Sequence, residues 1–197
     1  MLFEEKTIDS QNIYKGRFLE LKQDKVCLPN GKQSIREYVI HPGAMMIIPI
    51  LPDGQVVLER QYRYPVRELM IEFPAGKLDP GESALNCAKR ELFEETGYKA
   101  KNWAYAGQVY PCIGYSNEVI EIWLAKDLVA GPPQLDEGEF VETFTASIEQ
   151  LKQWMFDGII KDAKTLAGLH WLFAYHHNEL SLRWNEEDDA TSGDNKR

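Results

Sequence analysis

Three glutamates on one short predicted helix constrain this chain more than any other feature of its sequence. The segment that carries them starts at Ser83, a residue type that caps helices, and is followed by Gly97, which favours the left-handed conformation that ends them. At 3.6 residues per turn, Glu91, Glu94 and Glu95 fall within an arc of roughly 100°. Like charges at this spacing repel one another, and no lysine follows them within the predicted helix.

A solvated acidic face is the ordinary explanation of such a cluster. It is weak here because acidic groups near the end of a helix also oppose the helix dipole. A divalent cation would reverse this balance by neutralising the repulsion. Oxygen-only ligands with positions left open for water suit Mg²⁺ or Mn²⁺. The helix of residues 83–96 is therefore predicted to hold a metal ion.

The composition is that of an ordinary globular domain. The chain has 197 residues, 44% of them hydrophobic, and the longest apolar run, AMMIIPIL, is the length of a strand rather than of a membrane helix. The N-terminus lacks the pattern of a signal peptide, and the three cysteines form no CxxC pair, so we expect a cytoplasmic protein with reduced thiols. A net charge of −9 disfavours binding to nucleic acid or to anionic membranes.

Alternating apolar and polar residues, separated by turn sequences such as PNGK, predict mostly β-structure before the glutamate helix. Two further helices are expected after it, and the last of them carries a stripe of core residues. This pattern predicts an α/β sandwich with a mixed β-sheet, preceded by a small antiparallel β-extension. The expected division is an extension at 1–42, a main domain at 43–182 and a disordered acidic tail at 183–197.

The residues around the helix also match a family motif. Gly76 is followed after five residues by Glu82, then after seven by Arg90-Glu91-Leu92, and finally by Glu94-Glu95 and Gly97-Tyr98. This spacing resembles the Nudix box, with Tyr98 where a smaller aliphatic residue is commoner. The resemblance implies a Nudix-type α/β/α sandwich and an enzyme that cleaves the pyrophosphate linkage of a nucleoside diphosphate derivative.

The resemblance also assigns roles inside the box. Glu91 and Glu95 are expected to be metal ligands together with the backbone carbonyl of Ala75. Glu94 is expected to be a catalytic residue, as a further ligand or as the group that holds the attacking water. Glu82 is expected to order the loop and to pair with Arg90, with a metal role as the alternative for Glu82.

Segments outside the box resemble the ADP-ribose pyrophosphatase branch of this family. They are ERQYRYPV, EFPAGKLDPGE, YPCIGYSNE and DGIIKDAKTLAGLHWL, although Ile113 stands where that branch commonly has proline. In that branch a mobile acidic loop supplies the general base, and the matching segment here is LDEGEFVE. Glu137 is therefore the expected base, and Glu139 is expected to be a further metal contact or the alternative base.

For the substrate, the resemblance and the chemistry of guanidinium groups favour Arg63 as a phosphate contact, with a strand-surface ion pair as the alternative. Arg36 and Glu37 match positions that the branch uses near the adenine end, and Ser116 and Glu118 are expected to line the site. Because the extension often reaches a second subunit in the family, a homodimer is implied. The implied reaction is Mg²⁺-dependent hydrolysis of ADP-ribose to AMP and ribose 5-phosphate, with Mn²⁺ as a substitute metal.

Three alternatives stay open from the sequence. The substrate could be another nucleoside diphosphate sugar, such as GDP-mannose or UDP-glucose, or a dinucleotide. The chain could be a regulator that binds nucleotide-sugars without cleaving them, although such a protein would be expected to lose glutamates of the box. Isomerisation of an isoprenoid diphosphate would need a catalytic cysteine, and neither Cys87 nor Cys112 lies in a suitable context.

Overall fold

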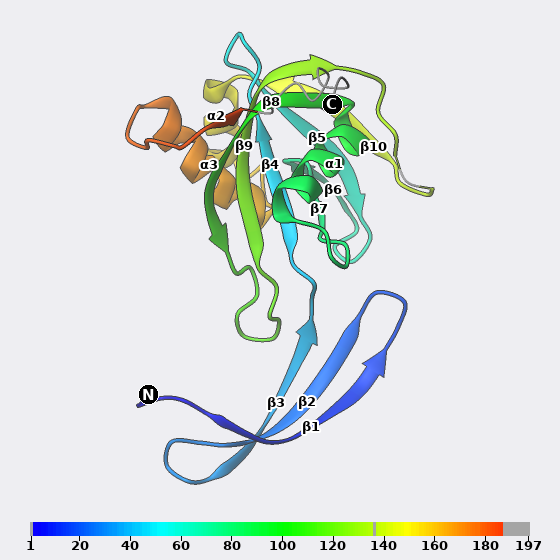
Figure 1. Cartoon of the computed structure of the whole chain (residues 1–197), viewed down its shortest axis with the longest axis vertical. Helices are drawn as coiled ribbons and strands as arrows, with labels where there is room; N and C mark the ends of the chain where they lie inside the picture. Colours follow the sequence, from blue (N-terminus) through cyan, green and yellow to red (C-terminus); the bar gives the residue numbers. More distant parts are fainter. Residues whose placement is uncertain (1, 136, 187–197) are drawn as a thin grey trace, which may run out of the picture.

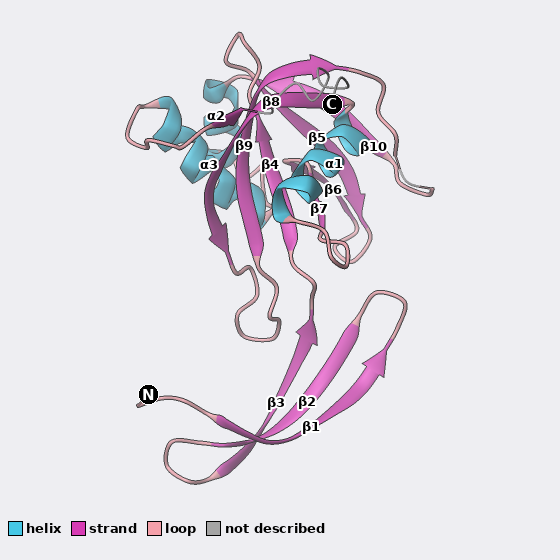
Figure 2. Ribbon diagram, viewed as in Figure 1, coloured by secondary structure: helices cyan, strands magenta, loops and turns pink. Residues whose placement is uncertain are grey.

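A five-stranded mixed sheet forms the centre of the protein. The computed structural model describes residues 2–135 and 137–186. The strand order of this sheet is β11-β8-β9-β4-β7, and β4 and β9 run parallel while the other neighbours are antiparallel (Figures 1 and 2). The strands are β4 (Ala44–Pro49), β7 (Ala75–Lys77), β8 (Tyr98–Val109), β9 (Ile120–Ala130) and β11 (Asn185–Glu186).

Strand β4 explains why this sheet is covered on both faces. All of its residues are buried, and successive side chains of a strand point to opposite faces. Met45 and Ile47 pack in a cluster with α1 (Ala84–Thr96). Met46 and Ile48 pack in a second cluster that includes residues of α2 (Ile148–Phe156) and α3 (Ala163–His176). The continuous apolar run in the sequence therefore fills two cores.

A second, antiparallel sheet brings further residues to the site. Its order is β10-β5-β6, formed by β5 (Val56–Arg63), β6 (Glu68–Glu72) and β10 (Val141–Ala146). Val56 and Leu58 of β5 are buried in the cluster that contains α3. The alternate residues Glu59, Gln61 and Arg63 belong to the other face of the strand, and their position decides the electrostatics of the site.

The N-terminal residues form a separate antiparallel sheet of β1 (Lys6–Lys15), β2 (Glu20–Cys27) and β3 (Gln33–Ile40). Figure 1 shows this sheet projecting away from the main body, with β3 leading into the sandwich. It is joined to the body near the end of β3, where Val39 N–H donates to the Tyr115 carbonyl at 2.8 Å and Asn117 N–H donates to the Val39 carbonyl at 3.3 Å.

The structure confirms the predicted α/β sandwich with a mixed sheet, and the antiparallel strands at its N-terminus. One boundary was wrong. The tail was expected to start at 183, but Leu182 and Trp184 pack on the core and Asn185 pairs with Trp103 of β8. Their apolar contacts keep the chain on the sheet up to Glu186, and the rest of the expected tail, 187–197, lies outside the described residues. None of the described helices has the length and apolar character needed to cross a membrane.

Candidate active site

Helix α1 carries the three glutamates, and both of its ends are capped by the residues that the sequence predicted. The Ser83 hydroxyl accepts a hydrogen bond from the Asn86 N–H at 3.3 Å. Gly97 adopts a φ of 75°, in the left-handed region that favours glycine, and its N–H donates to the Phe93 carbonyl at 2.8 Å. Cys87, Ala88 and Leu92 are buried against the five-stranded sheet. The opposite side of the helix is left for polar residues.

The short strand β7 fixes two of the carboxylates. Ala75 N–H donates to Glu95 Oε2 at 3.0 Å. Glu91 packs directly over Gly76, since a Cβ atom added to this glycine would lie 1.8 Å from the Glu91 carboxyl carbon. The glycine of the motif is therefore required by the close approach of a side chain, and not by its backbone conformation.

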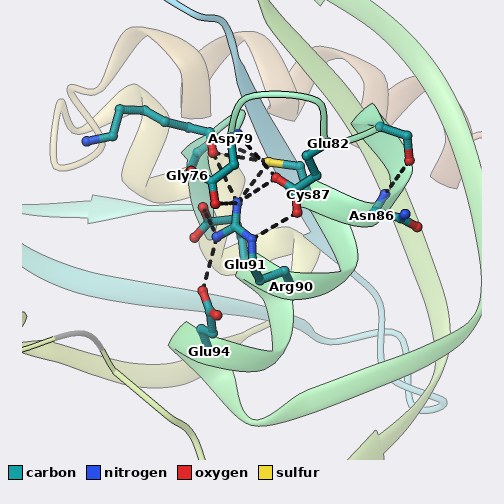
Figure 3. Close-up of polar contacts among 10 residues, drawn as sticks. Gly76, Asp79, Glu82, Asn86, Cys87, Arg90, Glu91 and Glu94 are labelled. Atoms are coloured by element: carbon teal, nitrogen blue, oxygen red, sulfur yellow. Dashed lines mark hydrogen bonds and ion pairs between the residues drawn. The ribbon is translucent and has the colours of Figure 1, made fainter. Parts of the chain in front are cut away.

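Arg90 lies at the centre of the polar contacts (Figure 3). Its Nε and Nη2 atoms donate to the two carboxylate oxygens of Glu82 at 3.0 and 2.8 Å, which confirms the predicted pair. Its Nη1 atom donates to Glu91 Oε1 at 2.7 Å and to Glu94 Oε2 at 3.1 Å. The hydrogen bond with Arg90 is the main cause that lowers the pKa of Glu82. Arg90 thus relieves part of the repulsion that the sequence pattern had left without a counter-charge.

Glu95 is the least compensated carboxyl group of the helix. Its side chain is buried, and burial is the main reason that its pKa is raised to about 10. The acidic neighbours Glu59, Glu91 and Glu139 raise it further. Burial likewise raises the pKa of Glu91, against the influence of Arg90. The metal-free site therefore carries more buried acid than its own cations neutralise.

The donor set fits a hard divalent cation in its chemistry, since carboxylate and carbonyl oxygens are the ligands that Mg²⁺ prefers. In residues 2–135 and 137–186, however, no three His, Cys, Asp or Glu side chains converge on one point that could hold a metal ion. Arg90 explains this, because it draws Glu91 and Glu94 toward its guanidinium group. A cation would have to replace Arg90 as the partner of these carboxylates.

One cavity of about 710 Å³ borders the glutamates. We group its lining residues by charge and by their place in the fold, and name the groups the carboxylate wall, the cationic wall and the end near the N-terminal sheet. The carboxylate wall contains Ala75, Gly76, Glu91, Glu94, Glu95 and Glu139; the cationic wall contains Arg63, Glu72, Lys161, Asp162 and Lys164; and the remaining end includes Phe18, His41, Lys77 and Glu118.

The structure brings Glu139, and not Glu137, to the carboxylate wall. Gln61 Nε2 donates to Glu139 Oε1 at 3.2 Å, and the charge of Glu139 acts on Glu91 and Glu95. Glu137 is exposed and is not among the residues that line the cavity. The two acids are separated by Gly138, whose φ of 87° lies in the left-handed region. The assignment of the base stays a prediction.

Of the residues expected to contact substrate, Arg63 and Glu118 line the cavity. Arg63 forms an ion pair with Glu72, as its alternative interpretation had it, while its side chain remains 40% exposed. Glu118 Oε1 lies 3.7 Å from His41 Nε2. Ser116 is not among the lining residues; its hydroxyl accepts from the Glu118 N–H at 3.1 Å.

Arg36 and Glu37 lie on β3 and do not line the cavity of their own chain. Arg36 donates through Nε and Nη2 to the two carboxylate oxygens of Glu5 at 2.8 and 2.6 Å. Glu37 accepts a hydrogen bond from Gln23 Nε2 at 2.8 Å. Within one chain these residues therefore belong to the N-terminal sheet and not to the site.

Two buried acids at the site were missed by the sequence analysis. Glu59 is fully buried on β5, and Glu72 is 1% exposed on β6; they are direct cross-strand partners. Glu59 alternates with Gln61 and Arg63 at the period of a strand, which places all three on one face. Extending the expected site from Arg63 by four residues along the strand would have found Glu59, whereas Glu72 lies on the neighbouring strand β6 and depends on the pairing of the two strands.

Comparisons with known proteins identify two sequence families in this chain. Residues 40–167 match the NUDIX domain, and residues 5–39 match the nucleoside diphosphate sugar hydrolase N-terminal domain. A methanol dehydrogenase activator from Bacillus methanolicus is 39% identical over 87% of this chain and 94% of its own length. ADP-ribose pyrophosphatases from Bacillus subtilis and Escherichia coli K12 are 37% and 30% identical, over 86% and 90% of this chain and 92% and 91% of their own.

The solved structure of an ADP compounds hydrolase superposes with a TM-score of 0.81 at 22% sequence identity, over 91% of this chain and 97% of that chain. This likeness supports the Nudix fold. The enzyme class is identified by the match over residues 40–167 and by the relatives named ADP-ribose pyrophosphatase. The chain belongs to the Nudix hydrolase family, as a pyrophosphatase.

Proposed function

We propose that this pyrophosphatase hydrolyses ADP-ribose to AMP and ribose 5-phosphate with Mg²⁺ as its metal ion. The observation that carries the proposal is a cavity lined both by the carboxylates of Glu91 and Glu95 and by the guanidinium of Arg63. A diphosphate needs both a metal-binding wall and a cationic wall. The relatives named ADP-ribose pyrophosphatase support the choice of sugar nucleotide.

In this proposal the metal ion is held by Glu91, Glu95, Glu139 and the backbone carbonyl of Ala75. When bound, Mg²⁺ neutralises charge on the pyrophosphate oxygens. The burial of Glu95 supports its role as a ligand, because a cation would offset the cost of an ionised carboxylate in that position. Glu94, the most exposed of the three helix glutamates, holds the water that attacks phosphorus.

Glu137 is proposed as the general base. It takes a proton from the water as the water oxygen bonds to one phosphorus and the bond from that phosphorus to the bridging oxygen breaks. Because Glu137 lies outside the cavity, the loop around Gly138 must move to bring it in. Arg63 contacts the diphosphate through its guanidinium, and Glu118 acts at the end of the cavity near the N-terminal sheet. Ser116 acts beside it, since its hydroxyl accepts from the Glu118 N–H.

A homodimer would explain the position of Arg36 and Glu37. Both lie on the projecting sheet, so they reach a substrate only if the sheet lies against a second copy of the chain (Figure 1). Exposed apolar side chains on this sheet, among them Ile8, Ile13 and Ile35, are consistent with such a contact. Light scattering coupled to size exclusion should give twice the mass of the chain; a monomer of full activity would refute this part of the proposal.

The decisive experiment is a hydrolysis panel with ADP-ribose, GDP-mannose, UDP-glucose and NADH, each with and without Mg²⁺. The proposal expects the highest kcat/KM with ADP-ribose, and no turnover without a divalent metal. A preference for GDP-mannose would refute the substrate and leave the enzyme class standing. Binding of ADP-ribose without turnover would favour the regulator that the sequence left open. The cytoplasmic location stays a prediction.

The choice of base is tested separately. Glu137→Gln should lower kcat by ~10²–10⁴ with little change in substrate affinity, on the scale of the loss of a general base. Glu139→Gln should mainly weaken Mg²⁺ binding. If Glu139→Gln has the greater loss of kcat at saturating Mg²⁺, the two roles are exchanged.

A further inference from the structure

The cationic wall of the cavity is organised around one buried carboxylate, Glu72 at the end of β6. Arg63 donates to its two oxygens through Nε at 2.6 Å and through Nη2 at 2.7 Å. Lys164 of α3 donates to the same carboxylate from the other side. Although burial raises the pKa of Glu72, these cations outweigh it and the pKa is lowered. Glu72 is thus an ionised anchor shared by two cations.

The start of α3 fixes Lys164 in this position. Asp162 caps the helix by accepting from the Thr165 N–H at 2.8 Å, and its carboxylate also accepts from Lys164 Nζ at 3.1 Å. The Phe73 N–H donates to the Thr165 hydroxyl at 3.1 Å, which ties α3 to the residue that follows β6. The Lys164 side chain is only 11% exposed. Its conformation is therefore set before any ligand arrives, and little of its entropy remains to be lost on binding.

Both cations retain hydrogen-bond donors for a ligand. A lysine ammonium has three N–H groups, and the contacts described for Lys164 use two of them. Arg63 uses Nε and Nη2 for Glu72, which leaves the two N–H groups of Nη1. Lys164 and Arg63 line the same cavity as Glu91 and Glu95. A diphosphate bound in this cavity would have both the carboxylates and these donors within its lining.

We propose that Lys164 binds the diphosphate group of the substrate beside Arg63, and that Glu72 is the positioning residue that holds both cations in place. The inference rests on the proposed function and adds a contact from α3 to it. The competing explanation is that Lys164 serves only as a counter-ion for Glu72. That role is already supplied by Arg63, whose two hydrogen bonds match the geometry of a carboxylate.

A double-mutant cycle separates the two explanations. The variants are Lys164→Met, Glu72→Gln and their combination, with Lys152→Met on the exposed face of α2 as the control for loss of one positive charge. The probe is ADP, whose affinity is measured by calorimetry and compared with that of adenosine. Thermal unfolding of each variant establishes that it folds.

Lys164→Met should weaken ADP binding by roughly 10- to 100-fold, the range for loss of a hydrogen bond to a charged group, and leave adenosine binding unchanged. Part of this loss should persist when Lys164→Met is made in the Glu72→Gln background, where no buried carboxylate needs a counter-ion and Asp162 still holds Lys164. Lys164→Arg should recover most of the affinity. The control Lys152→Met should bind ADP as the wild type does.

If Lys164→Met costs nothing further in the Glu72→Gln background, Lys164 is only a counter-ion and the proposal is overturned. The same conclusion follows if ADP and adenosine lose affinity equally. Failure of the wild type to cleave ADP-ribose would refute the proposed substrate instead, and the ADP binding cycle would still decide the role of Lys164.

Discussion

Replacing the buried Glu59 by glutamine should stabilise the metal-free protein, and by more as the pH rises. Glu59 is fully buried on β5, and within the described residues neither of its carboxylate oxygens has a hydrogen-bond partner. Its direct cross-strand neighbour is another acid, Glu72. Like charges at directly opposite positions of two strands destabilise a sheet. This position therefore works against folding whenever Glu59 is ionised.

The magnitude follows from the shifted pKa. Burial, and after it the negative charge of Glu72, raise the pKa of Glu59 from 4.5 to about 7. Below pH 4.5 the group is protonated in both the folded and the unfolded chain, so its titration does not change stability there. Between 4.5 and 7 the unfolded chain loses this proton while the folded chain keeps it. Stability therefore falls by about 1.4 kcal/mol per pH unit, to a total of about 3 kcal/mol.

Urea unfolding in EDTA at pH 5 and pH 8 measures this effect directly. Glu59→Gln should be within about 1 kcal/mol of the wild type at pH 5 and about 3 kcal/mol more stable at pH 8. The matched control is Glu142→Gln on the surface of β10, which removes an exposed acid. It should change the free energy of unfolding by the same amount at pH 5 and at pH 8. If the difference between Glu59→Gln and the wild type does not change with pH, the buried acid is not the source of strain and the reasoning is refuted.

Three further substitutions test other parts of the site. Gly76→Ala should lower kcat by at least ~10² because the added Cβ displaces the Glu91 carboxylate; unchanged kinetics would show that this carboxylate is not positioned by Gly76. Glu95→Gln should abolish turnover and weaken Mg²⁺ binding in calorimetry, with circular dichroism unchanged; full activity would contradict its role as a ligand. Ser83→Ala should lower the free energy of unfolding by about 1 kcal/mol in a urea titration through loss of the helix cap; an unchanged midpoint would show that the cap adds nothing.

Helix α1 could be predicted from the sequence because its determinants are local. Ser83 and Gly97 mark its ends, and the spacing of Glu91, Glu94 and Glu95 alone places them on one side. The pair of Arg90 with Glu82 was also predicted, on the resemblance to the Nudix box. The additional contacts of Arg90 with Glu91 and Glu94 were not, because they depend on which way a long side chain turns.

The two buried acids of the second sheet could not be predicted from local sequence in this way. Glu59 and Glu72 become neighbours through the register of β5 with β6, and neither strand was predicted to pair with the other. Lys164 joins them from a helix more than ninety positions along the chain. Contacts between elements that are distant in sequence depend on the packing of the whole domain, whereas a motif records only residues that are close together.

These contacts give one physical account of why the site needs so many charges. Glu95 and Glu59 are buried acids with raised pKa values, so the metal-free fold pays for them in stability. Arg90 relieves the acids on the surface of α1, and Arg63 with Lys164 relieves Glu72, but within the described residues no cation bonds to Glu59 or Glu95. Of these two acids, Glu95 lines the cavity, where its carboxylate accepts a hydrogen bond from the Ala75 N–H. A bound divalent cation would therefore stabilise the fold as well as serve the reaction, and loss of metal should lower the stability of the wild type more than that of Glu95→Gln.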